Sequence, residues 1–288
     1  MEETEKERRW IKLSKIQPSE LHLSSQRLEK IQEMEEEIGP LPIKSIGDKV
    51  FFTDGHHRAF KLWKRGEKEV EVYEDETDMD WLKYLICVHW CEKANLESIV
   101  DLRDRIVEEK EFRKLWIEKC QKMQERVDED IFEFIDFREE KDPDVKSDIC
   151  KKILEALPKY FGIEEAVKDY TQEVRDMYSV SASVGDTPVG FTALKEHNEF
   201  TSEVYVLGVL EELQRRGIGK RLMNEVEAET KSQGKKYLTV KTLGPSRLDE
   251  GYQKTRAFYR SAGFVPLEEF TTLWNEDNPC LLMVKSIE

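Results

Sequence analysis

The sequence predicts an α/β (α+β) protein with two consecutive domains. Two observations predict this fold class. Short apolar, β-branched segments alternate with segments of helical periodicity, and each half of the chain contains a compact polar turn between a strand and a helix. The 288 residues are enough for two domains that each bury a core. The acidic stretch at 125–130 marks the boundary, so we expect domains at 1–127 and 128–288.

The first half contains a predicted strand, a polar turn and a predicted helix in succession. Phe51 and Phe52 end the strand, and the turn that follows includes Asp54, Gly55, His56, His57 and Arg58. These residue types suit a phosphate group and its magnesium ion, with Arg58 as a bidentate clamp and Asp54 as a metal ligand or base. A surface turn with chance histidines is the alternative interpretation.

This turn resembles the nucleotide-binding signature of the ParB and sulfiredoxin-like domains, and most closely that of the free serine kinases. The segment 11–20 resembles the first strand of these kinases and its Pro-x-Glu turn, so Glu20 and Asp54 match candidate bases for a hydroxyl nucleophile. The resemblance covers about 10–72 and implies ATP or ADP with magnesium as ligands. The segments 80–93 and 99–124 then read as amphipathic helices in place of the larger second region of the kinases. We therefore expect either a kinase for a small hydroxyl compound such as serine or a domain that only senses a nucleotide.

The second half contains a strand at 203–209 and a helix at 220–234. Between them lies a loop that we expect to bind a diphosphate, formed by Gln214, Arg215, Arg216, Gly217, Ile218, Gly219 and Lys220. The glycines let the backbone approach an anion, and the first helical turn directs free N–H groups and the positive end of the helix dipole toward it. The spacing matches neither the dinucleotide-binding nor the P-loop pattern. A plain turn before a helix is the alternative.

This loop resembles the Gln/Arg-x-x-Gly-x-Gly/Ala loop of the GNAT family of N-acetyltransferases, which binds the pyrophosphate of acetyl-coenzyme A (acetyl-CoA). Residues 255–264 resemble the A-x-x-F-Y-x-x-x-G-F segment of the same family. The order of elements also fits, with a first strand at 132–137, a first helix at 146–161 and a hairpin of 180–184 with 189–194. The resemblance implies a GNAT fold, a mixed, mostly antiparallel sheet flanked by helices, with acetyl-CoA as the cofactor.

The resemblance also implies roles for single residues. Leu207 and Val209 offer backbone groups to the pantetheine amides where two parallel strands splay apart, and Gly208 between them tolerates a bulge. Tyr259 matches the tyrosine that points at the cofactor sulfur, so we predict it as the general acid. Glu203 is the predicted base, with deprotonation through water as the alternative. The expected acceptor is a small-molecule or peptide amine.

Composition and charge restrict the remaining functions. The formal net charge of -15 opposes nucleic acid as a partner. No apolar segment is long enough for a membrane span, and the charged amino terminus is unlike a signal peptide, so we expect a soluble cytoplasmic protein without a membrane partner. The five cysteines form no Cys-x-x-Cys pair. Cys87, His89 and Cys91 are assigned to core packing, and no metal site is expected.

The leading hypothesis is thus an acetyl-CoA-dependent N-acetyltransferase fused to a ParB/sulfiredoxin-like nucleotide-binding domain. A bifunctional enzyme with a second, kinase activity is one alternative. A non-catalytic sensor of acyl-CoA and nucleotide is the other. The oligomeric state stays open, with a homodimer among the options.

Overall fold

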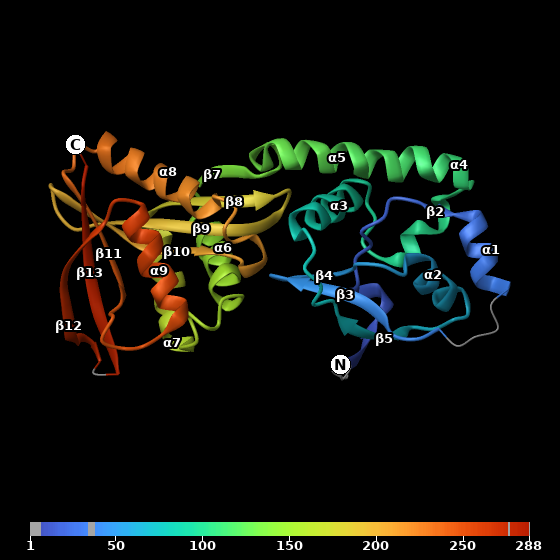
Figure 1. Cartoon of the computed structure of the whole chain (residues 1–288), viewed down its shortest axis with the longest axis horizontal. Coiled ribbons are helices and arrows are strands. Elements are labelled where there is room, and N and C mark those ends of the chain that lie inside the picture. Colours follow the sequence, from blue (N-terminus) through green and yellow to red (C-terminus); the bar gives the residue numbers. More distant parts are fainter. Residues whose placement is uncertain (1–6, 34–37, 276, 288) are drawn as a thin grey trace. The chain divides into compact units, whose positions relative to one another are not determined.

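The computed structural model describes residues 7–33, 38–275 and 277–287. The chain divides into two compact units (Figure 1), one formed by Met1–Ile135 with Val184–Thr187 and the other by Asp136–Ser183 with Pro188–Glu288. Each unit has its own sheet and its own buried apolar residues.

The N-terminal unit is built on a four-stranded sheet with the strand order β1-β5-β3-β4. Its strands are β1 (Arg8–Lys12), β3 (Leu41–Ile46), β4 (Lys49–Phe52) and β5 (Glu69–Glu74). The short strands β2 (Leu23–Ser24) and β6 (Ile106–Val107) pair separately in parallel. The 3₁₀ helix at Leu13–Lys15 follows β1 and leads into the turn that carries Glu20.

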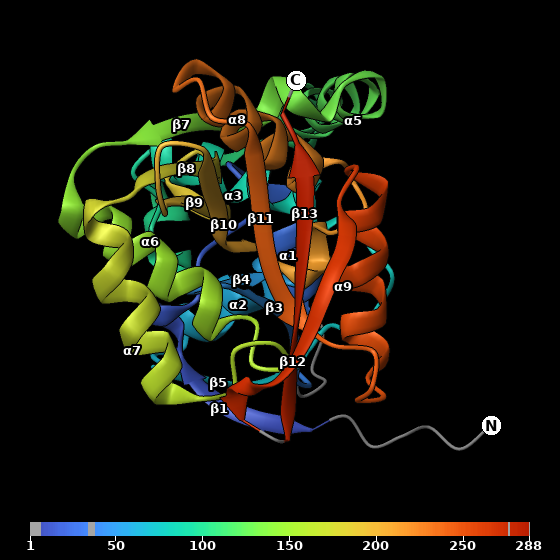
Figure 2. The same cartoon turned by 90° about the vertical axis from the view of Figure 1, so that its left-hand side faces the viewer.

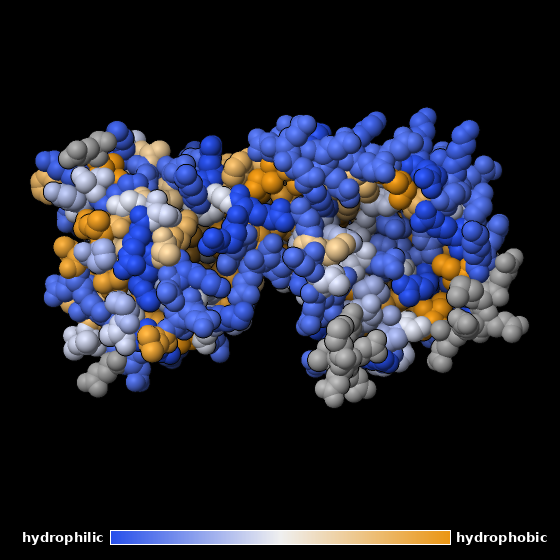
Figure 3. Space-filling model, in the orientation of Figure 1, coloured by the Kyte–Doolittle hydropathy of each residue, from blue (hydrophilic) through white to orange (hydrophobic). Residues whose placement is uncertain are grey.

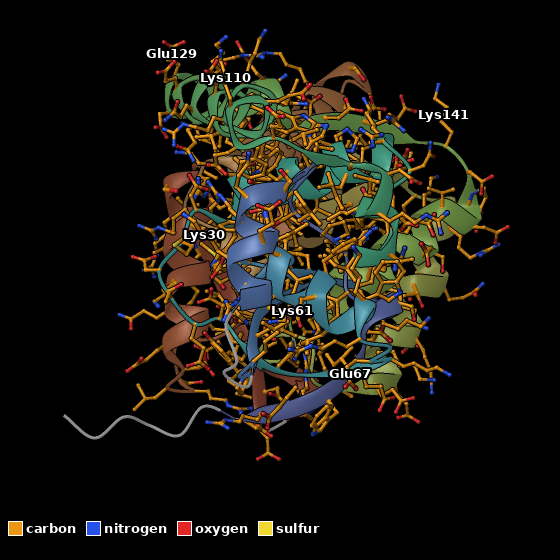
Figure 4. The ribbon with its side chains drawn as sticks, turned by 90° about the vertical axis from the view of Figure 1, so that its right-hand side faces the viewer. Lys30, Lys61, Glu67, Lys110, Glu129 and Lys141 are labelled. Carbon is orange, nitrogen blue, oxygen red and sulfur yellow. The ribbon has the colours of Figure 1, made fainter. Side chains whose placement is uncertain are left out.

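Helices surround this sheet. They are α1 (Ser25–Glu33), α2 (His56–Lys64), α3 (Trp81–Lys93), α4 (Glu109–Phe112) and α5 (Glu118–Glu129), with a π-helical turn at Arg113–Ile117 between the last two. Lys61 on α2, labelled in Figure 4, donates a hydrogen bond to the carbonyl of Ile31 on α1 and so fastens the two helices together. Along α5, Met123 and Val127 are buried while hydrophilic side chains cover the visible face (Figure 3).

The helix predicted at 80–93 is confirmed as α3, whereas the helix predicted at 99–124 is wrong in its first part. Ser98 and Asp101 form a capping box that starts a 3₁₀ helix at Ile99–Asp104 instead. The residues that follow form β6, which pairs with β2, and the N–H of Leu23 donates to the carbonyl of Arg105 beside this pair. Helical structure resumes only at Glu109, the first residue of α4.

The C-terminal unit contains a seven-stranded sheet with the order β12-β13-β11-β10-β9-β8-β7. The strands are β7 (Asp136–Glu140), β8 (Tyr178–Val184), β9 (Thr187–Glu196), β10 (Thr201–Val209), β11 (Tyr237–Leu243), β12 (Val265–Asn275) and β13 (Asn278–Ser286). β10 and β11 pair in parallel, while β10 with β9, β11 with β13, β12 with β13 and β7 with β8 pair antiparallel. The predicted mixed, mostly antiparallel sheet is therefore confirmed.

Helices cover both faces of this sheet (Figure 2). α6 (Pro143–Glu155) and α7 (Glu164–Glu173) lie on one face, and α8 (Ile218–Ser232) and α9 (Glu250–Ser261) lie on the other. The core under α8 and α9 joins Met223 and Tyr259 to strand residues such as Val204 and Val240. Burial of these side chains fixes the two helices on the sheet.

Two predicted elements have different bounds in the structure. The strand expected at 132–137 begins only at Asp136, because the Asp130 carboxylate accepts the N–H of Phe132 and starts a 3₁₀ helix at Ile131–Phe134. The helix expected at 146–161 is α6, which begins at Pro143 because Asp142 caps it. It ends at Glu155, earlier than predicted.

The parallel pairing of β10 with β11 is short. It runs from Thr201 opposite Tyr237 to Val204 opposite Val240 and then stops. On its other side, β10 changes register against β9 between Val204 and Val206, so Tyr205 is the extra residue of a bulge. The bulge thus lies at Tyr205 rather than at Gly208, the residue predicted to tolerate one. Beyond it, β10 and β11 separate.

The structure explains the glycine at position 208 by close packing and not by a bulge. A Cβ atom built there would lie 2.8 Å from Cγ2 of Ile153 and 3.1 Å from Cδ1 of Leu157. The absent side chain lets the segment that carries α6 approach the sheet closely.

We expect Gly208→Ala to destabilise the protein by about 1–3 kcal/mol, because the added methyl overpacks this contact. Urea unfolding followed by circular dichroism measures the change. Gly39→Ala is the matched control, since a Cβ there meets nothing within 4 Å. Equal stabilities of the two variants would contradict the close approach of α6 to β10.

Candidate functional site

The loop between β10 and α8 has an unusual backbone. Arg215 has a φ of 65° and Gly217 a φ of 88°, so the chain adopts left-handed conformations twice within three residues. This conformation strains Arg215 but not the glycine. An added Cβ at Gly219 would meet Phe258 at 3.6 Å, an ordinary contact, so Gly217 is the more restricted of the two glycines.

The loop is tied to the strand before it and opens a long helix. The side-chain amide of Gln214 donates to the carbonyl of Val209 at 3.0 Å. At the other end, the N–H of Arg221 returns to the carbonyl of Gly217 at 3.0 Å, which leaves the preceding N–H groups of the first turn directed out of the helix. Arg215 and Lys220 are exposed beside these N–H groups. The loop therefore offers donors and positive charge to an anion.

After the bulge, the described part of β11 no longer pairs with β10, and on that side the Val209 carbonyl accepts the Gln214 amide instead. The N–H of Leu210 donates to the carbonyl of Val189 on the β9 side at 3.0 Å. Because hydrogen-bonded and non-hydrogen-bonded pairs alternate in an antiparallel ladder, the polar groups of Leu207 and Val209 point away from β9. They face the side on which the pairing with β11 has ended. These are the two residues predicted to bind the pantetheine amides.

Tyr259 lies on α9 in the core of the unit and is 6% exposed. Its ring packs between Phe258, with a centroid separation of 5.4 Å, and Phe264, at 5.8 Å. Burial raises the pKa of the Tyr259 phenol well above its ordinary value, and the phenols of Tyr170 and Tyr252 raise it further. The phenol therefore keeps its proton at neutral pH.

Glu203 lies on β10, just before the bulge, and is 3% exposed. Its Oε2 atom lies 2.6 Å from Nε2 of His197 and 2.8 Å from Nζ of Lys241. Neither partner was predicted from the sequence. His197 precedes the strand and Lys241 lies on β11, so the parallel register of β10 with β11 was needed to bring them to one carboxylate.

The predicted acid and base flank the same point of β10. Tyr259 shares a core with Val204, under α8 and α9. The side chain of Glu203, one residue earlier, projects from the opposite face of the sheet. Tyr170 on α7 interacts electrostatically with both groups. The place where β10 leaves β11 thus has a proton donor on one side and a carboxylate on the other.

In the N-terminal unit, the Asp-Gly-His-His-Arg turn forms the start of α2, with Gly55 at φ 81°. His56 and His57 are buried, at 2% and 8% exposure. Nε2 of His56 accepts the N–H of Ser19 at 2.8 Å, and Nε2 of His57 accepts the N–H of Ser24 at 2.9 Å. Because Nε2 is the acceptor, each neutral ring carries its proton on Nδ1.

Both Nδ1 atoms face Glu20. The Glu20 carboxylate oxygens lie 3.8 Å from Nδ1 of His56 and 3.8 Å from Nδ1 of His57. Burial lowers the pKa of His56 to about 3 and that of His57 to about 4, so the two rings contribute N–H groups and no charge at neutral pH. Burial raises the pKa of Glu20 to about 8, an effect that the charge of Arg27 reduces and that of Asp54 increases.

Asp54 and Arg58 pair with each other at the rim of this turn, with Nη2 of Arg58 3.1 Å from Oδ2 of Asp54. The Asp54 side chain is 77% exposed. Gly55 has a φ of 81°, and a Cβ there would lie 3.1 Å from Cδ2 of Leu41, so the backbone of the turn favours glycine at this position. The structure therefore brings all the predicted residues of this turn to one place, together with Glu20.

Among the described residues, no group of three or more His, Cys, Asp or Glu side chains is arranged to hold a metal ion. In the same part of the chain, no helix has the length and apolar character that crossing a membrane requires.

Comparison with known proteins supports the GNAT resemblance for the C-terminal region. Residues 147–264 match the acetyltransferase (GNAT) family, a range that contains β10, the loop, α8 and Tyr259. The match supports acetyl-CoA-dependent acetyl transfer as the reaction class of this region. No match was found among curated proteins, and nothing in these comparisons supports the ParB and sulfiredoxin-like resemblance.

Several solved structures are similar in part. A putative GNAT-family acetyltransferase from Desulfovibrio desulfuricans is 21% identical, with a TM-score of 0.47, over 54% of this chain and 99% of that one. An aminoglycoside 6'-N-acetyltransferase complexed with coenzyme A is 20% identical, with a TM-score of 0.43, over 54% and 97%. The ribosomal-protein-S18-alanine N-acetyltransferase from Escherichia coli is 13% identical, with a TM-score of 0.44, over 54% and 94%. Since these scores lie below 0.5, the assignment rests on the family match.

The raised pKa of Glu20 predicts how stability depends on pH. The ordinary pKa is 4.5 and the folded value is about 8, so the folded protein holds a proton that the unfolded chain has lost between these values. The contribution of Glu20 is fully present below 4.5 and is lost as pH rises toward 8.

Glu20→Gln removes this titration. We expect the variant to gain stability relative to the wild-type protein from about pH 5 to about pH 8, by on the order of 1–3 kcal/mol. Urea unfolding at several pH values checks this. A stability difference that stays constant over this range would show that Glu20 does not hold its proton in the folded protein.

Proposed function

We propose that the C-terminal unit is an acetyl-CoA-dependent N-acetyltransferase and that it transfers the acetyl group to a primary amine. The observation that carries the proposal is the opening between β10 and β11 after Val204, because it combines free strand backbone with an anion-binding loop at its end. The family match over residues 147–264 supports the same reaction class.

The chain's residues fit the cofactor. The N–H groups at the start of α8, with Arg215 and Lys220, would hold its pyrophosphate, and the backbone of Leu207 and the N–H of Val209 would hold the pantetheine amides. The carbonyl of Val209 is already bonded to Gln214. The bound cofactor supplies a thioester that is open to attack by an amine. Every other part of the reaction falls to the protein, which orients the amine and moves two protons.

Glu203 and Tyr259 are proposed for these proton transfers. Glu203 accepts a proton from the attacking amine, and the buried anionic carboxylate also attracts an ammonium group to the opening. Tyr259 retains its proton at neutral pH and donates it to the leaving sulfur. The two groups lie on opposite sides of β10, which suits an acid and a base that act on different atoms of one reaction.

Paired substitutions separate binding from chemistry. We expect Gly217→Val to abolish acetyl-CoA binding in calorimetry, because a β-branched residue does not tolerate a φ of 88°. Tyr259→Phe should bind acetyl-CoA normally but lower turnover with an amine panel by roughly 10²–10⁴-fold. Unchanged turnover would remove Tyr259 as the acid, and retained affinity in Gly217→Val would remove the loop as the pyrophosphate site. Binding without transfer to any amine would instead indicate a sensor.

We also propose that the N-terminal unit binds ATP or ADP with magnesium and uses Glu20 as a base toward a small hydroxyl compound. The observation that favours it is the Glu20 carboxyl, which has a pKa of about 8 and lies between two imidazole N–H groups beside the start of α2. Asp54 and Arg58 stand at the exposed rim, where a phosphate and its metal would approach.

Calorimetry with ATP and ADP in magnesium tests this second site, followed by a phosphorylation assay with serine. Glu20→Ala should keep the nucleotide heat and lose phosphorylation by roughly 10²-fold or more. Asp54→Asn should weaken the magnesium-dependent part of binding. Nucleotide binding without phosphorylation by the intact protein would leave a sensor in place of a kinase.

A further inference from the structure

The Glu203 carboxylate is anchored through one of its two oxygens. Oε2 lies 2.6 Å from Nε2 of His197 and 2.8 Å from Nζ of Lys241. Within the described part of the chain, Oε1 makes no hydrogen bond. It is also not completely sealed from solvent. The second oxygen therefore keeps its capacity to accept a hydrogen bond, on a side chain that is 4% exposed.

Both contacts on Oε2 come from donors. A carboxylate oxygen only accepts, and the Lys241 ammonium only donates, so the Nε2 of His197 must carry a proton to bond to the same atom. Two donors on one oxygen, one from the turn before β10 and one from β11, restrict the rotation of the carboxylate. Charge-assisted hydrogen bonds of this kind are about twice as strong as neutral ones.

The backbone that carries His197 is itself held in place. Its N–H donates to the carbonyl of Thr201 at 3.1 Å across the turn between β9 and β10. Lys235, whose side chain is 6% exposed, reaches the same turn, with Nζ 2.9 Å from the carbonyl of Asn198 and 3.1 Å from Oε2 of Glu196. The imidazole thus projects from a turn that hydrogen bonds hold at both His197 and Asn198.

Lys241 is held from the other side of the opening. It lies in β11 opposite Leu282 of β13, one residue beyond Val240, where the parallel pairing with β10 ends. One donor therefore comes from the turn that precedes β10, and the other comes from β11, the strand across the opening. The orientation of Glu203 depends on both of them.

We propose that His197 and Lys241 are positioning residues of the acetyl-transfer site, which hold Oε2 of Glu203 so that Oε1 receives the proton of the acceptor amine. The inference rests on the proposed function. In the step it describes, the N–H bond of the amine breaks, an O–H bond forms on Oε1, and the electron pair stays on the amine nitrogen for attack. Neither His197 nor Lys241 gains or loses a proton.

The test compares substitutions that keep or remove the donor at position 197. His197→Leu should lower kcat by about 10²-fold, as expected when a reacting group loses its alignment. The affinity for acetyl-CoA and the KM of the amine should stay close to the wild-type values, because the proposal places the imidazole against Glu203 and not against either ligand. His197→Gln restores an N–H donor and should recover most of the lost kcat.

A second pair of variants covers the case in which His197→Leu does not fold. Lys241→Met should lower kcat in the same way. Lys285→Met is its matched control. Lys285 also lies on a strand of this sheet, β13, and forms an ion pair with a glutamate, but its partner is Glu227 at 2.5 Å and not Glu203. The control should keep full activity.

The outcomes are distinct. Loss of kcat in His197→Leu and Lys241→Met, with rescue by His197→Gln, supports the assignment. A folded His197→Leu or Lys241→Met with wild-type kcat overturns it and leaves the acetyltransferase proposal intact. A loss in His197→Leu that His197→Gln fails to rescue also overturns it. A wild-type protein that binds acetyl-CoA but acetylates no amine overturns both proposals.

Discussion

The candidate transferase site depends on the separation of β10 from β11. Parallel strands normally satisfy each other's backbone groups along their whole length. Here the pairing ends at Val204, and the bulge at Tyr205 turns the rest of β10 away. Backbone groups that would otherwise be used in the sheet become available, and they lie next to the loop that opens α8.

The same separation organises the side chains. Before the bulge, β10 places Val204 in the core beside Tyr259 and directs Glu203 to the other face. The turn before β10 then supplies His197, and β11 supplies Lys241, to one oxygen of Glu203. A buried carboxylate is costly unless it is paired, so these two partners are also what makes Glu203 tolerable at 3% exposure.

The N-terminal unit uses burial in a different way. Its two histidines are neutral because their rings are packed away from water and accept backbone N–H groups. Their protons therefore point at Glu20, whose own burial favours the protonated acid. In the sequence, this turn is a set of charged and titratable groups. In the structure, its histidines are neutral, and Asp54 and Arg58 form an exposed ion pair.

The sequence by itself determined the local features of this protein. The glycine pattern at Gly217 and Gly219, the apolar alternation of β10 and the periodicity of α8 predicted a strand, an anion-binding loop and a helix, because such preferences act over a few residues. Capping by Asp130 and by Ser98 with Asp101 was also present in the sequence, but it competed with apolar periodicity and shifted the elements at 131–135 and 99–108. Only the tertiary structure decided the bulge at Tyr205, the buried state of His56 and His57, and the meeting of His197, Glu203 and Lys241. These features depend on the pairing of strands and on burial among residues distant in sequence, which local preference does not encode.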